Sequence, residues 1–130
     1  ALNMTPVLCI GETGDERKNG KTNEVLETQL SAALRGLVWP KGIELIIAYE
    51  PVWAIGTGES CAPEEAEKVC ALISDWTSKL LGLRPVILYG GSVSSENIRA
   101  YVDQSSIRGV LVGGASAKKG SWAGLVEKLF

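Results

Sequence analysis

The sequence predicts an α/β fold in which a parallel β-sheet is covered by helices, and three observations support this. Short apolar runs of strand length alternate with amphipathic stretches of helical length along the chain. The runs are almost continuously apolar, which is typical of strands buried on both faces. Glycine or a polar residue follows each run directly, and repeated strand–helix alternation favours a parallel sheet.

Four strand–helix units are expected. The expected strands are 7–10, 44–49, 85–89 and 109–112, and the expected helices are about 23–36, 63–81, 94–103 and 121–129. Right-handed crossovers put the carboxyl ends of all parallel strands on one side of the sheet. The residues that follow the strands, among them Glu12, Glu50, Ser92 and Gly113–Gly114, should therefore converge there.

Three of the expected helices carry an apolar face at helical spacing. The faces are Leu26, Leu30, Ala33, Leu34 and Leu37 in the first, Ala66, Val69, Cys70, Ile73, Trp76 and Leu80 in the second, and Trp122, Leu125, Val126 and Leu129 in the last. Pro63 suits the first turn of the second helix, and Gly82 is well placed to cap its C-terminal end.

Length and charge limit the classes of partner. The 130 residues are enough for one domain with a buried core. The formal net charge of −2 gives no basis for binding nucleic acid or an anionic membrane surface. No apolar run approaches the roughly 20 residues that a membrane-spanning helix needs. We therefore expect neither nucleic acid nor a membrane as a partner.

The cysteine and histidine content limits the chemistry. The three cysteines are odd in number and lack C-x-x-C spacing, so free thiols in a reducing cytoplasm fit best. Cys9 and Cys70 stand among apolar residues, and burial is expected for both. The chain contains no histidine, which excludes a Ser-His triad and the usual zinc sites within it. Neither a metal nor a cofactor is expected.

A single carboxylate, Glu50, follows an apolar run and directly precedes a proline, where the strand should stop. The apolar segment after it ends in two glycines, an arrangement that suits a lid moving on hinges to exclude water. The pattern predicts an acid–base residue followed by a lid, although a solvated strand end and a packed loop would have the same spacing. The lid would comprise Pro51, Val52, Trp53, Ala54, Ile55, Gly56, Thr57 and Gly58.

Glycine pairs follow the last two expected strands, in Gly90-Gly91-Ser92 and Gly113-Gly114. Glycine lets backbone N–H groups approach an anion without an intervening Cβ, and Ser92 adds a hydroxyl donor. A short helix beginning near Ser94 or Ser95 would aim its N-terminus at the same anion. Either pair alone is better explained as a chain turn. Two pairs on consecutive strands match the phosphate site of βα barrels.

These segments together resemble the C-terminal half of the triosephosphate isomerase family. The matching segments are Pro6–Glu12 (PVLCIGE), Ala48–Gly58 (AYEPVWAIGTG), Tyr89–Val93 (YGGSV) and Leu111–Ser116 (LVGGAS). They occur in the family's order and near its spacing. The lid segment is highly specific, and the four segments extend over most of the chain.

The resemblance implies a role for each candidate residue. Glu50 would be the base that moves a proton between two carbons of a triose phosphate through an enediol-like intermediate, and residues 51–58 would close over it. Gly56, Ser92, Gly113 and Gly114 would bind the substrate phosphate, with Tyr89 and Ser92 also holding the closed lid. Cys9 and Glu12 would have structural roles. The family also implies glycolysis and gluconeogenesis as context and a homodimer when complete.

The sequence departs from the family pattern in extent. The family barrel has eight βα units over about 250 residues, whereas four are expected here, so residues 1–130 would correspond to strands five to eight with the N-terminal half absent. The family's electrophilic histidine and its substrate-binding asparagine and lysine would belong to that missing half. Lys18, Lys21 and Lys41 do not stand in that lysine's motif. We therefore expect an incomplete site and an inactive isolated fragment.

Two other interpretations remain open at the level of sequence. A half-barrel could retain phosphate affinity alone and act as a binding module. Another βα-barrel enzyme, acting on phosphorylated indole or sugar intermediates, would share the glycines after the last two strands but would not be expected to carry the lid. An Asn-x-Lys after the first strand of the barrel and a histidine after its fourth would distinguish the complete isomerase from the module.

Overall fold

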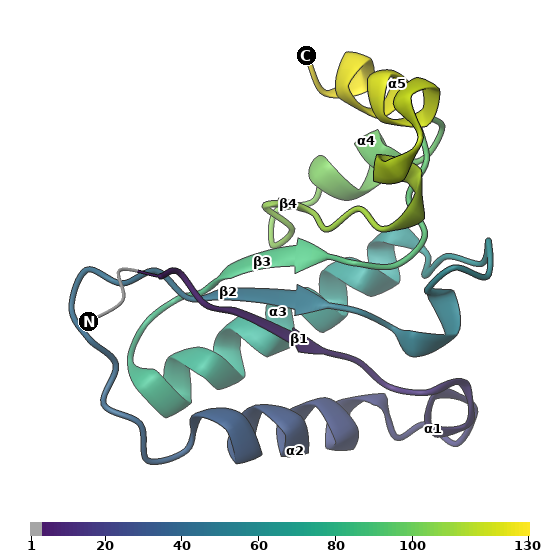
Figure 1. The fold of residues 1–130 in the computed structure, drawn as a ribbon. Coiled ribbons are helices and arrows are strands. Elements are labelled where there is room, and N and C mark those ends of the chain that lie inside the picture. Colours follow the sequence, from purple (N-terminus) through teal and green to yellow (C-terminus); the bar gives the residue numbers. More distant parts are fainter. Residues whose placement is uncertain (1–3) are drawn as a thin grey trace.

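Four parallel strands form one sheet in the computed structural model, which describes residues 4–130 (Figure 1). The strands, in sheet order, are β1 (Val7–Ile10), β2 (Ile46–Tyr49), β3 (Val86–Tyr89) and β4 (Gly109–Val110). The helices are α1 (Gly14–Lys18), α2 (Thr22–Leu34), α3 (Pro63–Leu81), α4 (Ile98–Val102) and α5 (Lys119–Leu129), with 3₁₀ turns η1 (Val52–Ala54) and η2 (Gly114–Ala117). The prediction of an α/β fold with a parallel sheet is confirmed.

One face of the sheet is buried by helices. Rows of aligned side chains, Leu8–Ile47–Ile87 and Ile10–Tyr49–Tyr89, cross the strands on this face and belong to the core. Helices α2 and α3 lie on this side of the sheet, while α4 and α5 lie near β4 (Figure 1). Full burial of a side chain such as Ile47 or Ile87 contributes about 1.5–3 kcal/mol, so this face carries much of the stability.

The other face is only partly covered, and the expectation of strands buried on both faces is wrong for β1 and β3, whereas Ala48 of β2 is fully buried on this face. Val7 is 47% exposed, and Ile46 and Val86, its partners in the register, are partly buried. Cys9 on the edge strand is exposed, which corrects its expected burial, whereas Cys70 on α3 is buried as expected. The alternation of buried and less buried residues along β3 is that of a sheet with one helix-covered face.

Helix α3 follows the sequence prediction closely. Pro63 occupies its first turn, and Gly82 caps its end with φ of 69°, a conformation that glycine adopts without strain. Its buried residues are Ala66, Val69, Cys70, Ile73 and Thr77. No helix in the described range 4–130 is both long enough and apolar enough to cross a membrane.

Helix α2 ends earlier than predicted, at Leu34. Leu26, Leu30 and Leu34 are buried as expected, but Ala33 and Leu37 are exposed. Leu37 lies beyond the helix end, so helical spacing no longer governs where its side chain points.

The segment between β1 and α2, for which no helix was predicted, contains the short helix α1. Thr13 is its N-cap, with the Glu16 amide donating to the Thr13 hydroxyl and the Glu16 carboxylate accepting from the Thr13 amide. This reciprocal pattern is a capping box, which satisfies backbone donors at a helix start. It explains why a five-residue helix forms in a segment without an apolar stripe.

The C-terminal elements are displaced from their predicted bounds. β4 ends at Val110 and not at 112, and it pairs with Leu88 and Tyr89 of β3. α5 begins at Lys119, and Leu125 is its buried residue, while Trp122 is 48% exposed. α4 begins at Ile98 because the preceding residues form a local turn in which the Asn97 side chain accepts from the Ser94 amide.

We expect the isolated chain to self-associate, because β1 and β4 are the edge strands of this sheet and edge strands pair readily with other chains. Sedimentation velocity at micromolar concentration should show oligomers. Val7→Lys, which puts a charge on the exposed edge strand, should shift the population towards monomer. Thr28→Lys adds the same charge to an exposed position of α2 and should not. A monomer whose strand amides resist hydrogen exchange would contradict this prediction.

Candidate active site

The candidate residues gather where the parallel strands end. Glu50 follows β2, Gly90 follows β3, and Gly113 lies three residues beyond the end of β4. The expected lid, residues 51–58, lies between β2 and α3 in the chain. Glu12 also follows a strand, but its side chain is fully buried and does not line the site. The predicted convergence is therefore observed for Glu50, the lid and the glycine turns.

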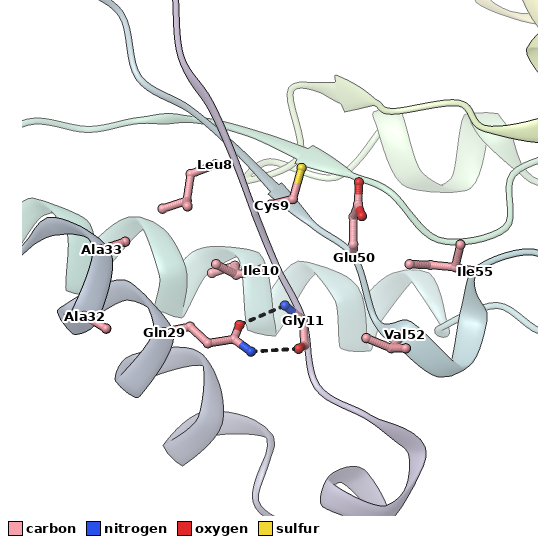
Figure 2. Close-up of a pocket in the computed structure, with 10 residues that line it drawn as sticks. All are labelled: Leu8, Cys9, Ile10, Gly11, Gln29, Ala32, Ala33, Glu50, Val52 and Ile55. Atoms are coloured by element: carbon pink, nitrogen blue, oxygen red, sulfur yellow. Dashed lines mark hydrogen bonds between the residues drawn. The ribbon is translucent and has the colours of Figure 1, made fainter.

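Glu50 continues the side-chain alternation of β2 onto the less covered face of the sheet. Figure 2 shows its carboxylate and the Cys9 thiol projecting to the same side, while Ile10 points away towards the helices. The Glu50 amide donates to the Ile10 carbonyl at 2.7 Å, and Pro51 then ends the strand. Glu50 and Cys9 line a hollow of about 590 Å³ that also borders α2.

Two glycines make room for Glu50. A Cβ on Gly90 would lie 2.5 Å from Cγ of Glu50, and a Cβ on Gly11 would lie 1.7 Å from the Glu50 carbonyl oxygen. Any side chain at either position would displace the acidic residue. Gly11 is itself held by Gln29, whose amide both donates to and accepts from its backbone at 3.0 Å (Figure 2). Sequence analysis missed Gln29, because nothing in its helix distinguishes it.

The thiol of Cys9 has a raised pKa. The first cause is partial withdrawal of the sulfur from water, followed by the negative charge of Glu50 and a hydrogen bond with it. A raised pKa keeps the thiol protonated and weakly nucleophilic at neutral pH. Cys9 is thus a neutral neighbour of the candidate base.

The lid is anchored at its N-terminal half and exposed at its tip. The Val52 amide donates to the Glu12 carbonyl at 2.9 Å, and Ala54 is buried. The tip, Ile55–Gly58, is exposed, and Gly56 and Gly58 have φ of 69° and 82°, a region in which other residues are strained. The two glycines predicted to be hinges therefore have backbone conformations that favour glycine.

The buried carboxylate of Glu12 forms a hydrogen bond with the N-terminal part of the lid. Its Oε1 accepts from the Tyr49 hydroxyl at 3.1 Å and from the Trp53 indole at 3.0 Å, and Oε2 has no partner among the described residues. Burial raises the pKa of Tyr49, and the charge of Glu12 raises it further. Glu12 was expected to have a structural role, and its hydrogen bonds with Tyr49 and Trp53 connect β2 to the lid.

Two stacked tyrosines hold the chain just after the lid. The Tyr89 hydroxyl accepts from the Cys61 amide at 3.0 Å, and the Tyr101 hydroxyl donates to the Cys61 carbonyl at 2.5 Å. The rings of Tyr89 and Tyr101 stack with centroids 4.1 Å apart. Tyr89 was expected to help hold the lid. Tyr101 was not identified, and its place in a short helix gave no signal.

The four candidate phosphate-binding residues line one hollow. Gly56, Ser92, Gly113 and Gly114 border a space of about 290 Å³, together with Gly90 and Gly91. Its lining contains neither lysine nor arginine, so an anion there would depend on backbone N–H groups. Ile55 lines this hollow and the one containing Glu50, so the two spaces adjoin at the lid.

The donors in this hollow differ in availability. A Cβ on Gly113 or Gly114 would meet no atom within 4 Å, so the space beside both residues is open. The Ser92 amide and hydroxyl both donate to the Ala54 carbonyl, at 2.9 and 2.7 Å, which ties the serine to the lid. The predicted help from a helix beginning at Ser94 or Ser95 is not observed, because α4 begins at Ile98 and the Ser94 amide is occupied by Asn97.

The fold and the candidate site define an α/β protein with parallel strands and a glycine-lined hollow at the carboxyl ends of the strands, where βα-barrel enzymes have their active sites. Residues 1–129 match the family model described as triosephosphate isomerase. The chain therefore belongs to the triosephosphate isomerase family, as its resemblance indicated. The family suggests an isomerase and implies a small phosphorylated triose as its substrate.

We expect Glu50→Gln to accelerate alkylation of Cys9. The Glu50 carboxylate raises the pKa of this thiol, so removing the charge lowers that pKa and increases the thiolate fraction at mildly alkaline pH. Iodoacetamide labelling followed by mass spectrometry measures the rate. Cys61, whose pKa is raised to about 11 by burial and then by Glu65, and the buried Cys70 serve as slow internal controls. An unchanged Cys9 rate would show that the two groups are not electrostatically coupled.

Proposed function

We propose that this chain contributes the base, the lid and the phosphate loops of a triose-phosphate isomerase, which interconverts dihydroxyacetone phosphate and glyceraldehyde 3-phosphate. The single observation that carries the proposal is the family match over residues 1–129. The position of Glu50 beside the lid and close to the glycine-lined hollow supports it.

Glu50 would act as a general base. Its carboxylate would take a proton from one carbon of the bound triose phosphate and return it to the neighbouring carbon, through an enediolate. A carboxylate is a stronger base when water is excluded from it. The apolar lid side chains Val52 and Ile55, about half exposed and bordering the same hollow as Glu50, are suited to exclude that water once the lid closes.

The substrate phosphate would lie in the glycine-lined hollow. Backbone N–H groups of Gly56, Gly113 and Gly114 would donate to it, and the open space beside Gly113 and Gly114 supports this. The Ser92 hydroxyl would have to rotate away from the Ala54 carbonyl before it could donate to a phosphate. Phosphate binding and lid movement would then be coupled through Ser92.

The electrophile that polarises the substrate carbonyl would come from outside these 130 residues, because the chain contains no histidine. We propose that residues 1–130 are the C-terminal half of a (β/α)8 barrel, and that a segment carrying the histidine, asparagine and lysine completes it. Alone, the chain would show no measurable isomerase activity. The complete enzyme would be a cytoplasmic homodimer acting in glycolysis and gluconeogenesis.

The alternative is a half-barrel that binds phosphate without catalysis. The position of Glu50 beside the apolar side chains of Val52 and Ile55 favours the isomerase, because phosphate binding alone does not require a carboxylate under an apolar cover. Membership of the triosephosphate isomerase family argues against an enzyme acting on phosphorylated indole or sugar intermediates.

We expect mixing the chain with a family N-terminal half to restore isomerase activity, and Glu50→Gln to lower kcat in that complex by about 10²–10⁴-fold, the range of general-base losses. KM should change far less, because the phosphate contacts remain. Glu59→Gln removes an exposed carboxylate just beyond the lid and is the matched control. Near-normal turnover in Glu50→Gln would show that Glu50 is not the base.

We expect Gly113→Val to abolish binding of inorganic phosphate to the chain. Its side chain would enter the open space where the anion is proposed to lie, because a Cβ at this position meets no atom within 4 Å. Phosphorus NMR titration measures the affinity. Gly120→Val, at an equally open position on α5, is the control and should bind as the unmodified chain does. If Gly113→Val kept its phosphate affinity, the anion site would lie elsewhere.

A further inference from the structure

Arg17 makes three contacts that the proposed mechanism does not use. It lies on α1, which the capping box of Thr13 and Glu16 holds in place. Its guanidinium carbon lies 4.2 Å from the centroid of a Trp53 ring. One terminal nitrogen lies 2.6 Å from the Glu65 carboxylate on α3, and the other lies 3.8 Å from Oε1 of Glu12.

These contacts connect the lid to two helices through one side chain. A planar guanidinium can stack on an aromatic face and pair with a carboxylate at its edge in the same conformation, whereas an ammonium group cannot. The pairing with Glu65 therefore fixes Arg17 over Trp53. A Cβ on Gly14, at the start of α1, would lie 3.5 Å from Cβ of Trp53, so the helix itself also contacts this residue.

Arg17 also lies near the carboxylate of Glu12, which accepts a hydrogen bond from the Trp53 indole. Glu12 is fully buried, and its Oε2 lacks a partner among the described residues. A buried carboxylate is costly without a nearby cation, and Arg17 supplies one. Arg17 thus contacts the face of the Trp53 ring and also lies near Glu12, which accepts the hydrogen bond of the Trp53 indole N–H.

We propose that Arg17 is a positioning residue that fixes the N-terminal end of the lid, so that motion is confined to the tip, Ile55–Gly58. The proposal rests on the proposed function of residues 51–58 as a lid. Arg17 would act through Trp53 and Glu12 and would not contact substrate. Glu65 on α3 would be its partner in this role, since the ion pair orients the guanidinium.

Hydroxyl-radical footprinting of the full chain, without substrate, tests this in whatever assembly the chain adopts. Oxidation of Trp53 is read by mass spectrometry against Trp39 and Trp76, and amide exchange is read for residues 52–54 and for β2 and β3. We expect Arg17→Met to raise Trp53 oxidation and exchange at 52–54 by about fivefold, with β2 and β3 unchanged. Arg17→Lys and Glu65→Gln should give intermediate values. Arg99→Met removes an exposed ion pair on α4 and is the control, with no expected change.

Two results would overturn the proposal. The first is unchanged Trp53 oxidation in Arg17→Met, or in Arg17→Lys, which retains the charge but loses the planar stack. The second is an equal loss of protection in β2 and β3, which would mean that Arg17 only stabilises the fold. The footprinting result does not depend on catalysis. If Glu50→Gln retained turnover, Glu50 would not be the base, but the oxidation of Trp53 would be unaffected.

Discussion

The buried carboxylate of Glu12 is the interaction on which the arrangement of the site depends. Its Oε1 accepts hydrogen bonds from Tyr49 at the end of β2 and from Trp53 in the lid, so the residues on either side of Glu50 share one acceptor. The Glu12 carbonyl also accepts from the Val52 amide. Because a buried carboxylate is stable only with such partners, the loop after β1 and the chain around Glu50 must adopt their positions together.

The less covered face of the sheet carries the candidate chemistry. Helices bury the face that bears Ile47 and Ile87, and that burial stabilises the fold. Glu50 and Cys9 project from the opposite face (Figure 2), where less protein surrounds them. The side chains that stabilise the fold and the candidate catalytic residue thus lie on opposite faces of a single sheet, because side chains alternate between the faces along each strand. The same separation leaves Val7 exposed on an edge strand, which is a liability for the isolated chain.

Buried and exposed parts of the proposed lid are separated in a similar way. Ala54 is buried and its carbonyl accepts both donors of Ser92, while the tip beyond it is exposed and contains two glycines with positive φ. On the far side, the stacked pair of Tyr89 and Tyr101 holds Cys61. A segment held by contacts at both ends and exposed between them has the arrangement expected of the proposed lid.

The sequence by itself determined the parallel α/β class, the bounds of α3, the position of Glu50 at a strand end and the glycines that line the candidate phosphate-binding hollow. These follow from local rules: apolar periodicity, the fixed φ of proline and the freedom of glycine. Only the tertiary structure decided that Cys9 is exposed, that Ser92 is bonded to Ala54, and that Arg17 and Glu65, far apart in the chain, meet over Trp53. Each of these depends on which elements become neighbours, and local sequence carries no direct record of such contacts.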